Sequence, residues 1–168
     1  MSRTFITSRY PAKRSRSRSS LTSDGFTVVE LLITAAIILT IAAIAIPNYL
    51  GAVEQAKVAK AIGDIHTIGN GIIGYEATNR QYPATLADIG FGETLDPWGQ
   101  PYQYLDFTDV KGKGKMRKDR FLVPINTYFD LYSMGKDGKS VAPLTASASQ
   151  DDIIWASDGA FVGLASDF

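Results

Sequence analysis

Three aspartates in the carboxyl-terminal third of the chain are the residues whose type and spacing point most directly to a bound ion. Asp137 lies in a Gly/Lys-rich turn at 135–139, and Asp151 and Asp152 follow one loop later. Adjacent carboxylates repel each other unless a cation or hydrogen-bond donors lie between them. Calcium takes about six to eight oxygens from Asp, Glu, backbone carbonyls and water. The spacing admits a calcium ion between Asp137 and the Asp151-Asp152 pair, although an Asp-Gly dipeptide is also an ordinary turn sequence.

Glu30 is the second chemically distinctive residue, because it is the one charged side chain in the apolar run from Phe26 to Ile46. A helix of about 20 residues spans a bilayer, and the run has that length. A carboxylate at mid-bilayer costs about 2.5–3.5 kcal/mol, and less near a helix end. Polar residues inside a span are usually functional and paired. Glu30 therefore requires a partner.

Other kinds of site have little support in the composition. The chain has no cysteine and one histidine, His66, which excludes disulfides and thiolate chemistry and argues against zinc and most histidine acid–base schemes. Ser157 and Asp158 have no histidine close in sequence, and the glycine-rich pieces match no phosphate-binding loop. We interpret His66 as a polar neighbour on a helix and predict that the protein is not an enzyme.

The two parts of the chain carry opposite charge. Before Phe26 lie six basic residues and one acidic residue, a net charge of +5, so the remainder sums to −5. A mildly acidic remainder does not suggest a nucleic-acid partner. A basic flank holds its side of a span in the cytoplasm, so the chain from Phe26 onward is expected to cross outward. Cleavage as a secretory signal at 43–45 competes with this reading, but the apolar run is longer than such signals have.

A long helix follows from the spacing of apolar residues. Beyond the span, apolar residues recur at helical period from Ala61 to Tyr75, which predicts one helix from Phe26 to Asn79. Pro47 and Gly51 are expected to bend or locally melt it.

After the helix the pattern changes to turns and short strands. Residues 85–88 predict a capped helical turn, and residues 96–99 predict a tight turn. Strands are predicted at 101–107, at 121–125 and 127–132 with a break at Pro124, and at 153–162. The basic loop 111–120 is predicted to be a solvated hairpin tip or, alternatively, a docking patch. The fold class is therefore α+β, with one long helix packed on a small antiparallel sheet.

Three motifs resemble a known family. Gly25-Phe26-Thr27-Val28-Val29-Glu30-Leu31-Leu32, with a basic leader before it and Pro47 behind it, resembles the signature of type IV pilins and type II secretion pseudopilins. The segments Asp96-Pro97-Trp98-Gly99-Gln100-Pro101-Tyr102 and Tyr132-Ser133-Met134-Gly135-Lys136-Asp137-Gly138 look like the major pseudopilin of type II secretion.

That resemblance implies roles for particular residues. A prepilin peptidase would cut after Gly25 and N-methylate Phe26. Glu30 would then meet the new terminal ammonium of a neighbouring subunit and set filament register. A pilin-like fold with a calcium-binding loop would place Asp137, Asp151 and Asp152 as ligands of Ca²⁺.

The resemblance also implies an organisation and a function. Residues 1–25 would be the leader, 26–46 the transmembrane and filament-core helix, and 47–168 a periplasmic globular domain. The chain would sit in the inner membrane with its N-terminus cytoplasmic. It would then polymerise into a periplasmic pseudopilus that drives protein export, with an assembly platform and minor pseudopilins as partners. A type IV pilus subunit and a signal-anchored periplasmic protein that does not polymerise remain the alternatives.

Overall fold

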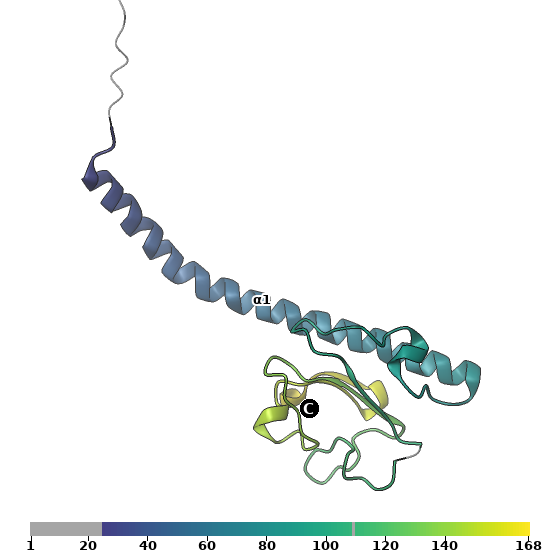
Figure 1. The fold of residues 1–168 in the computed structure, drawn as a ribbon. Helices are drawn as coiled ribbons and strands as arrows, with labels where there is room; N and C mark the ends of the chain where they lie inside the picture. The colour runs from purple at the N-terminus through teal and green to yellow at the C-terminus, as the bar shows by residue number, and fades with distance from the viewer. Residues whose placement is uncertain (1–24, 109) are drawn as a thin grey trace, which may run out of the picture. The chain divides into compact units, whose positions relative to one another are not determined.

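The computed structural model describes residues 25–108 and 110–168, and its elements follow the order helix, then strands (Figure 1). The regular elements are the helix α1 (Val28–Asn79) and the strands β1 (Gln103–Asp106), β2 (Phe129–Ser133), β3 (Ile153–Ala156) and β4 (Phe161–Leu164). Three short 3₁₀ turns lie between them and a fourth follows β4: η1 (Leu86–Ile89), η2 (Ser147–Ser149), η3 (Ser157–Gly159) and η4 (Ala165–Asp167). The chain divides into two compact units, Met1–Ala43 and Ile44–Phe168, and each is described by itself.

The first unit consists, where it is described, of a short lead-in and the N-terminal part of α1. Nearly every side chain there is exposed, and the large apolar ones are more than half exposed, including Leu31, Ile38 and Leu39. Within the described residues, α1 is the one helix long and apolar enough to cross a membrane. An apolar surface of this size requires lipid or other apolar helices around it.

In the second unit, α1 buries one stripe against a sheet. Ala61, Ile65, Ile68 and Ile72 are completely buried, as the helical spacing predicts. Gly69 is also buried on this stripe, and the ring of Trp155 fills the space where a side chain would otherwise lie. An added Cβ at Gly69 would come within 2.3 Å of that ring. The helix is continuous through Pro47 and Gly51, so of the two expected outcomes, a bend or a local melting, the melting does not occur.

The four strands form one antiparallel sheet in the order β1-β2-β3-β4. Alternate side chains point to opposite faces of a sheet. Leu131 and Trp155 belong to the core that includes the buried residues of α1, whereas Ile154 belongs to a second core with Ile125 and Leu144. Loops thus cover the face of the sheet that α1 does not. This arrangement confirms the predicted α+β, pilin-like fold.

Two hydrogen bonds connect the polar side of α1 to the segment before β1. Trp98 donates its ring N–H to Glu54 at 2.9 Å, and Tyr102 donates its hydroxyl to Asp64 at 2.8 Å. Asp64 also pairs with Lys60 one turn earlier, at 2.6 Å. Burial and the nearby Asp64 carboxylate raise the pKa of Tyr102 above its ordinary range, so its hydroxyl keeps its proton and remains a donor.

Two strand predictions are corrected. Residues 121–125 form no regular strand, because Pro124 has no N–H to give to a ladder and Asp119 and Leu122 bond each other in a tight turn. The segment predicted as one strand at 153–162 is two, β3 and β4, joined by η3 with positive φ angles at Ser157 and Asp158. The predicted turns at 85–88 and 96–99 are present: Thr85 and Asp88 form a capping box, and Gly99 has a φ of 90°.

Candidate functional site

The start of α1 holds the first candidate site, and its geometry centres on Glu30. The backbone N–H and the hydroxyl of Thr27 both donate to Oε2 of Glu30, at 2.8 and 2.9 Å. The backbone N–H of Glu30 donates back to the Thr27 hydroxyl at 3.2 Å. This reciprocal pair is a capping box, which satisfies N–H groups that the first turn of a helix leaves without partners.

The peptide bond between Gly25 and Phe26 stands just outside this box. Phe26 is 81% exposed, and no atom of the described residues, its chain neighbours apart, lies within 4 Å of the place where a Cβ on Gly25 would be. Among the described residues, therefore, none covers the predicted cleavage point. The rest of the predicted leader, residues 1–24, lies outside the described residues.

Thr27 is a residue of this candidate site that the sequence analysis missed. The signal was present in the sequence, since a Thr followed three residues later by Glu before an apolar run is the pattern of a capping box. Within one subunit, Thr27 gives Glu30 a partner through Oε2. Both of the bonds that Thr27 donates go to Oε2, and Oε1 accepts no hydrogen bond from residues 25–108 and 110–168.

The loop between β2 and β3 contains the second candidate site. The backbone N–H of Asp137 donates to Oδ2 of Asp151 at 2.9 Å, and Oδ1 of Asp137 accepts from the backbone N–H of Lys139 at 2.7 Å. Gly135 lies against the backbone of Asp151, where an added Cβ would stand 2.1 Å from the Asp151 carbonyl oxygen. The structure thus brings Asp137 and Asp151 together, with a carbonyl oxygen beside them.

Asp152 takes a different direction from its neighbour. Its side chain is completely buried, and its Oδ2 accepts from the guanidinium of Arg117 and from the Ser140 hydroxyl. Burial raises the pKa of Asp152 to about 6, while Ser140 and Arg117 oppose that rise by bonding the charged form. These partners bind Oδ2 alone, and the buried Oδ1 of Asp152 has no hydrogen-bond partner among the described residues. The role of Asp152 as a calcium ligand therefore stays a prediction, as it does for Asp137 and Asp151.

Arg117 also changes the interpretation of the basic loop 111–120. Its side chain is buried, lies 4.3 Å from the centre of the Tyr132 ring and donates to the carbonyl of Val141 at 2.7 Å. Its backbone N–H donates to the buried carboxylate of Asp130 at 2.6 Å. The loop is therefore fastened to the sheet by one of its own basic residues and is not a freely solvated hairpin tip.

The described residues contain no larger cluster of acidic and histidine side chains. Within residues 25–108 and 110–168, no three His, Cys, Asp or Glu side chains lie close enough together to hold a metal ion by themselves. A cation at Asp137 and Asp151 would consequently depend on backbone carbonyls and water for its remaining ligands. Asp158 is engaged elsewhere, since it accepts from the backbone N–H and the hydroxyl of Thr127 at 2.7 and 2.6 Å.

The chain is similar to several secretion proteins along most of its length. It is 32% identical over 137 residues to the type II secretion system core protein G of Pseudomonas aeruginosa, which covers 69% of this chain and 85% of that protein. It is 29% identical over 138 residues to the protein of the same name from Aeromonas hydrophila, covering 70% and 85%. This chain belongs to the family of type II secretion system core protein G, the major pseudopilins.

Membership of the major pseudopilin family agrees with the exposed apolar part of α1, and together they make this a membrane-anchored protein. A fimbrial protein of Pseudomonas aeruginosa is 33% identical over 93 residues, but the match covers only 52% of this chain and 60% of the fimbrial protein. No family model matches the chain, and no solved structure matches it.

Proposed function

We propose that this chain is a non-enzymatic structural subunit that polymerises into a periplasmic pseudopilus and so drives protein export in type II secretion. Family membership supports this function, and the observation that carries it is the capping box at the start of α1. A single exposed carboxylate, Glu30, stands at the head of an apolar helix with Oε2 bound by Thr27. Polymerisation gives the apolar helix surface a cover and gives Glu30 its second partner.

Maturation would create that partner. A prepilin peptidase cuts after Gly25, leaving Phe26 with a free amino group that is then N-methylated. The cut removes the basic leader with its net charge of +5 and places a cation at the helix start of each subunit. In the filament, the ammonium of Phe26 in one subunit pairs with Glu30 of its neighbour, and this pair sets the register. Breaking a buried ion pair costs about 3–5 kcal/mol, which is enough to decide assembly.

The orientation follows from the leader. Its positive charge holds the N-terminus in the cytoplasm, so residues 26–46 cross the inner membrane and residues 47–168 fold in the periplasm. An assembly platform in the inner membrane would then extract the subunit into the filament, and minor pseudopilins would complete it.

Mass spectrometry of the mature protein tests this proposal most directly. A mature N-terminus at Phe26 carrying one methyl group is the expected result. Any other N-terminus would remove the cation on which the pairing with Glu30 depends. Glu30→Ala supplies the second arm: the variant should insert in the membrane at the wild-type level and yet form no filament. A chain that assembles normally with alanine at this position would show that the pairing with Glu30 does not direct assembly.

The subunit of a surface type IV pilus is the second candidate, and the partial similarity to a fimbrial protein favours it. Electron microscopy separates the two functions. Short filaments confined to the periplasm at native expression fit secretion, whereas abundant long surface filaments fit a pilus.

Calcium binding belongs to this proposal. Asp137 and Asp151, which a hydrogen bond joins, would hold the ion together with backbone carbonyls and water. Calcium supplies a fixed positive charge that removes the repulsion between the two carboxylates. These residues would thereby hold the long segment from Gly138 to Gln150 against β3.

A further inference from the structure

An aromatic hollow opens at one end of the sheet. It has a volume of about 190 Å³ and is lined by Ile73, Tyr82, Tyr128, Phe129, Trp155 and Asp158. Tyr82 and Tyr128 stack with their ring centres 5.5 Å apart, and Ile73 and Tyr128 are 44% and 51% exposed. A cavity of about 150 Å³ accepts a benzene ring, so this hollow has room for one aromatic side chain.

The surroundings of the hollow are acidic. Burial raises the pKa of Tyr82, and the charges of Glu76, Asp158 and Asp106 raise it further. A second hollow beside it is also lined by Tyr82 and Asp106, together with Asp88. The site therefore favours an aromatic group that arrives with positive charge around it.

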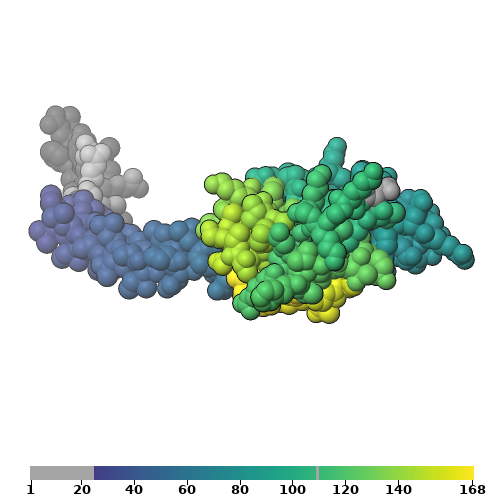
Figure 2. Space-filling model, turned by 90° about the horizontal axis from the view of Figure 1, so that it is seen from below, coloured from purple at the N-terminus to yellow at the C-terminus, as the bar shows by residue number. Residues whose placement is uncertain are grey.

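The loop between β1 and β2 presents such a group. Phe121 is fully exposed, at 101%, and its neighbour Leu122 is 50% exposed. The basic residues Lys111, Lys113, Lys115 and Arg120 are also exposed on this loop. Figure 2 views the molecule from below with respect to Figure 1, and the segment that contains this loop covers much of the visible face of the globular unit. A large exposed aromatic residue among basic residues is typical of a contact surface.

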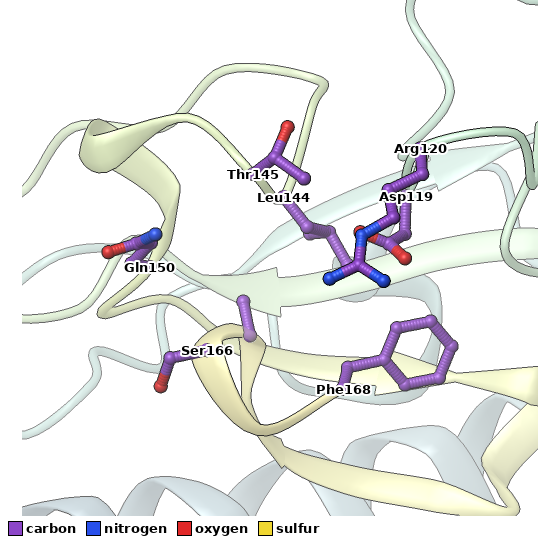
Figure 3. Close-up of a pocket in the computed structure, with 8 residues that line it drawn as sticks. Asp119, Arg120, Leu144, Thr145, Gln150, Ser166 and Phe168 are labelled. Carbon is purple, nitrogen blue, oxygen red and sulfur yellow. The ribbon is translucent and has the colours of Figure 1, made fainter.

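The two features lie at opposite ends of the sheet. The hollow lies at the end of the sheet where β2 begins, at Phe129, and where β3 ends, two residues before Asp158. The turn at 119–122 lies at the other end. There Asp119 and Arg120 line a shallow depression with Gln150, which precedes β3, and with Ser166, which follows β4 (Figure 3). One molecule consequently cannot fill its own hollow with its own Phe121.

We propose that the turn at 119–122 of one copy docks on a second copy, with Phe121 inside the aromatic hollow and against the residues that line it, Tyr82 and Tyr128 among them. The contact joins unlike surfaces at the two ends of the globular unit. Such a heterologous contact does not pair two copies and stop; unless it closes into a ring, it continues as a helical row. This inference rests on the proposed function of a filament subunit and names the contact between the globular units of that filament.

Cysteine cross-linking tests the contact, because the chain has no cysteine of its own. The full-length double variant Leu122→Cys, Ile73→Cys places one thiol beside the docking residue and one in the hollow. Treatment of intact cells with a short bismaleimide should give a ladder of covalent multiples on a denaturing gel. The matched control replaces Leu122→Cys by Val141→Cys, a residue of similar exposure at 45%, and should give no ladder.

A single-cysteine chain can link at most two copies, so neither single variant should give a ladder. If the double variant gives none either, while the same cells contain filaments, the docking surface is refuted and the proposed function stands. A cross-link from Leu122→Cys to a protein other than a second copy also overturns the inference. If the wild-type chain forms no filament at all, the proposed function fails, and this contact fails with it.

Substitution of the docking residue gives an independent measurement. The side chain of Phe121 is fully exposed and so contributes little to the packing of its own subunit. Phe121→Ser should therefore leave the amount of folded, membrane-inserted subunit unchanged. Loss of a central aromatic contact weakens an interface by about tenfold or more, and sedimentable filament should fall accordingly. Phe121→Tyr keeps the ring and should keep the filament. Equal assembly of the serine and tyrosine variants overturns the proposal.

Discussion

The guanidinium of Arg117 and the carboxylate of Asp152 form an ion pair inside the globular unit, although 35 residues separate them in sequence. Both side chains are buried, at 3% and 0% exposure. One end of the pair lies in the basic loop before β2, and the other lies at the start of β3. The pair thus ties the loop between β1 and β2 to the sheet, and its removal should lower the stability of the whole globular unit.

Arg117→Met should lower the free energy of unfolding by about 3–5 kcal/mol at pH 7, because it leaves the Asp152 charge buried without a cationic partner. Urea unfolding of the detergent-solubilised chain, followed by the fluorescence of Trp98 and Trp155, measures the change. Lys115→Met alters an exposed charge on the same loop and should change stability by less than about 0.5 kcal/mol. Addition of Asp152→Asn to the arginine variant should recover part of the loss; no recovery would show that packing, not charge, is the cause.

The pH dependence of stability should reveal Asp152. Its pKa is raised from the ordinary value of 3.8 to about 6, so the folded state holds this proton more tightly than the unfolded state. The contribution is then fully present below about pH 4 and is lost as the pH rises through about 6. Relative to Asp152→Asn, the wild-type chain should lose about 2–3 kcal/mol across that window. A stability difference that stays flat or rises over the same window would mean that Arg117 dominates the titration.

Gly69 should not tolerate a side chain. An added Cβ would stand 2.3 Å from the ring of Trp155, and overpacking of a core costs about 1–3 kcal/mol. Gly69→Ala should therefore destabilise the chain, as measured by its melting temperature. Gly63 lies on the same helix with nothing within 4 Å of its added Cβ, so Gly63→Ala should stabilise by up to about 1 kcal/mol. Equal shifts for the two variants would contradict the contact with Trp155.

Thr27→Val should loosen the first turn of α1. The hydroxyl that bonds Glu30 is lost, and loss of such a cap costs about 0.5–2 kcal/mol. Amide hydrogen exchange of the full chain in micelles should speed up several-fold at residues 28–30. Thr40→Val serves as the control, because that hydroxyl bonds only the carbonyl of Ala36 within the helix, at 2.8 Å. Unchanged exchange at 28–30 in the Thr27 variant would argue against the capping box.

Chelation of calcium should lower the melting temperature of the wild-type chain, since a ligand that binds only the folded state stabilises it. Asp137→Asn and Asp151→Asn should abolish the difference between calcium and chelator. Asp152→Asn should keep it if the ion rests on the other two residues, because Oδ2 of Asp152 is already bound to Arg117. If Asp152→Asn alone removes the difference, the assignment of ligands is wrong.

Local patterns determined much of the fold in advance. The helical spacing of Ala61, Ile65, Ile68 and Ile72 identified the buried stripe, because period alone decides which side of a helix is apolar. The Thr85 cap and the turn at Gly99 were predictable for the same local reason. The break inside the final predicted strand was not, since the left-handed turn at Ser157 and Asp158 occupies residues that do not usually mark one.

Long-range pairing explains what the sequence could not reveal at the site. Asp151 and Asp152 are adjacent and chemically alike, yet side chains alternate, so one points toward the loop and the other into the interior. Which of them meets the loop depends on Arg117, and nothing near Arg117 in sequence distinguishes it from the other basic residues of its loop. The capping box of Thr27 and Glu30, by contrast, was predictable from the sequence, because its two residues are only three positions apart.

The attachment of α1 to the rest of its unit has a mechanical consequence. Glu54 holds Trp98, Asp64 holds Tyr102, and Gly69 receives the ring of Trp155, at three levels spread over about 22 Å of helix axis. A force directed along the helix loads all three levels in shear at the same moment, whereas a peeling force would load them one after another. The globular unit is therefore stiffest against thrust along the axis of its own helix.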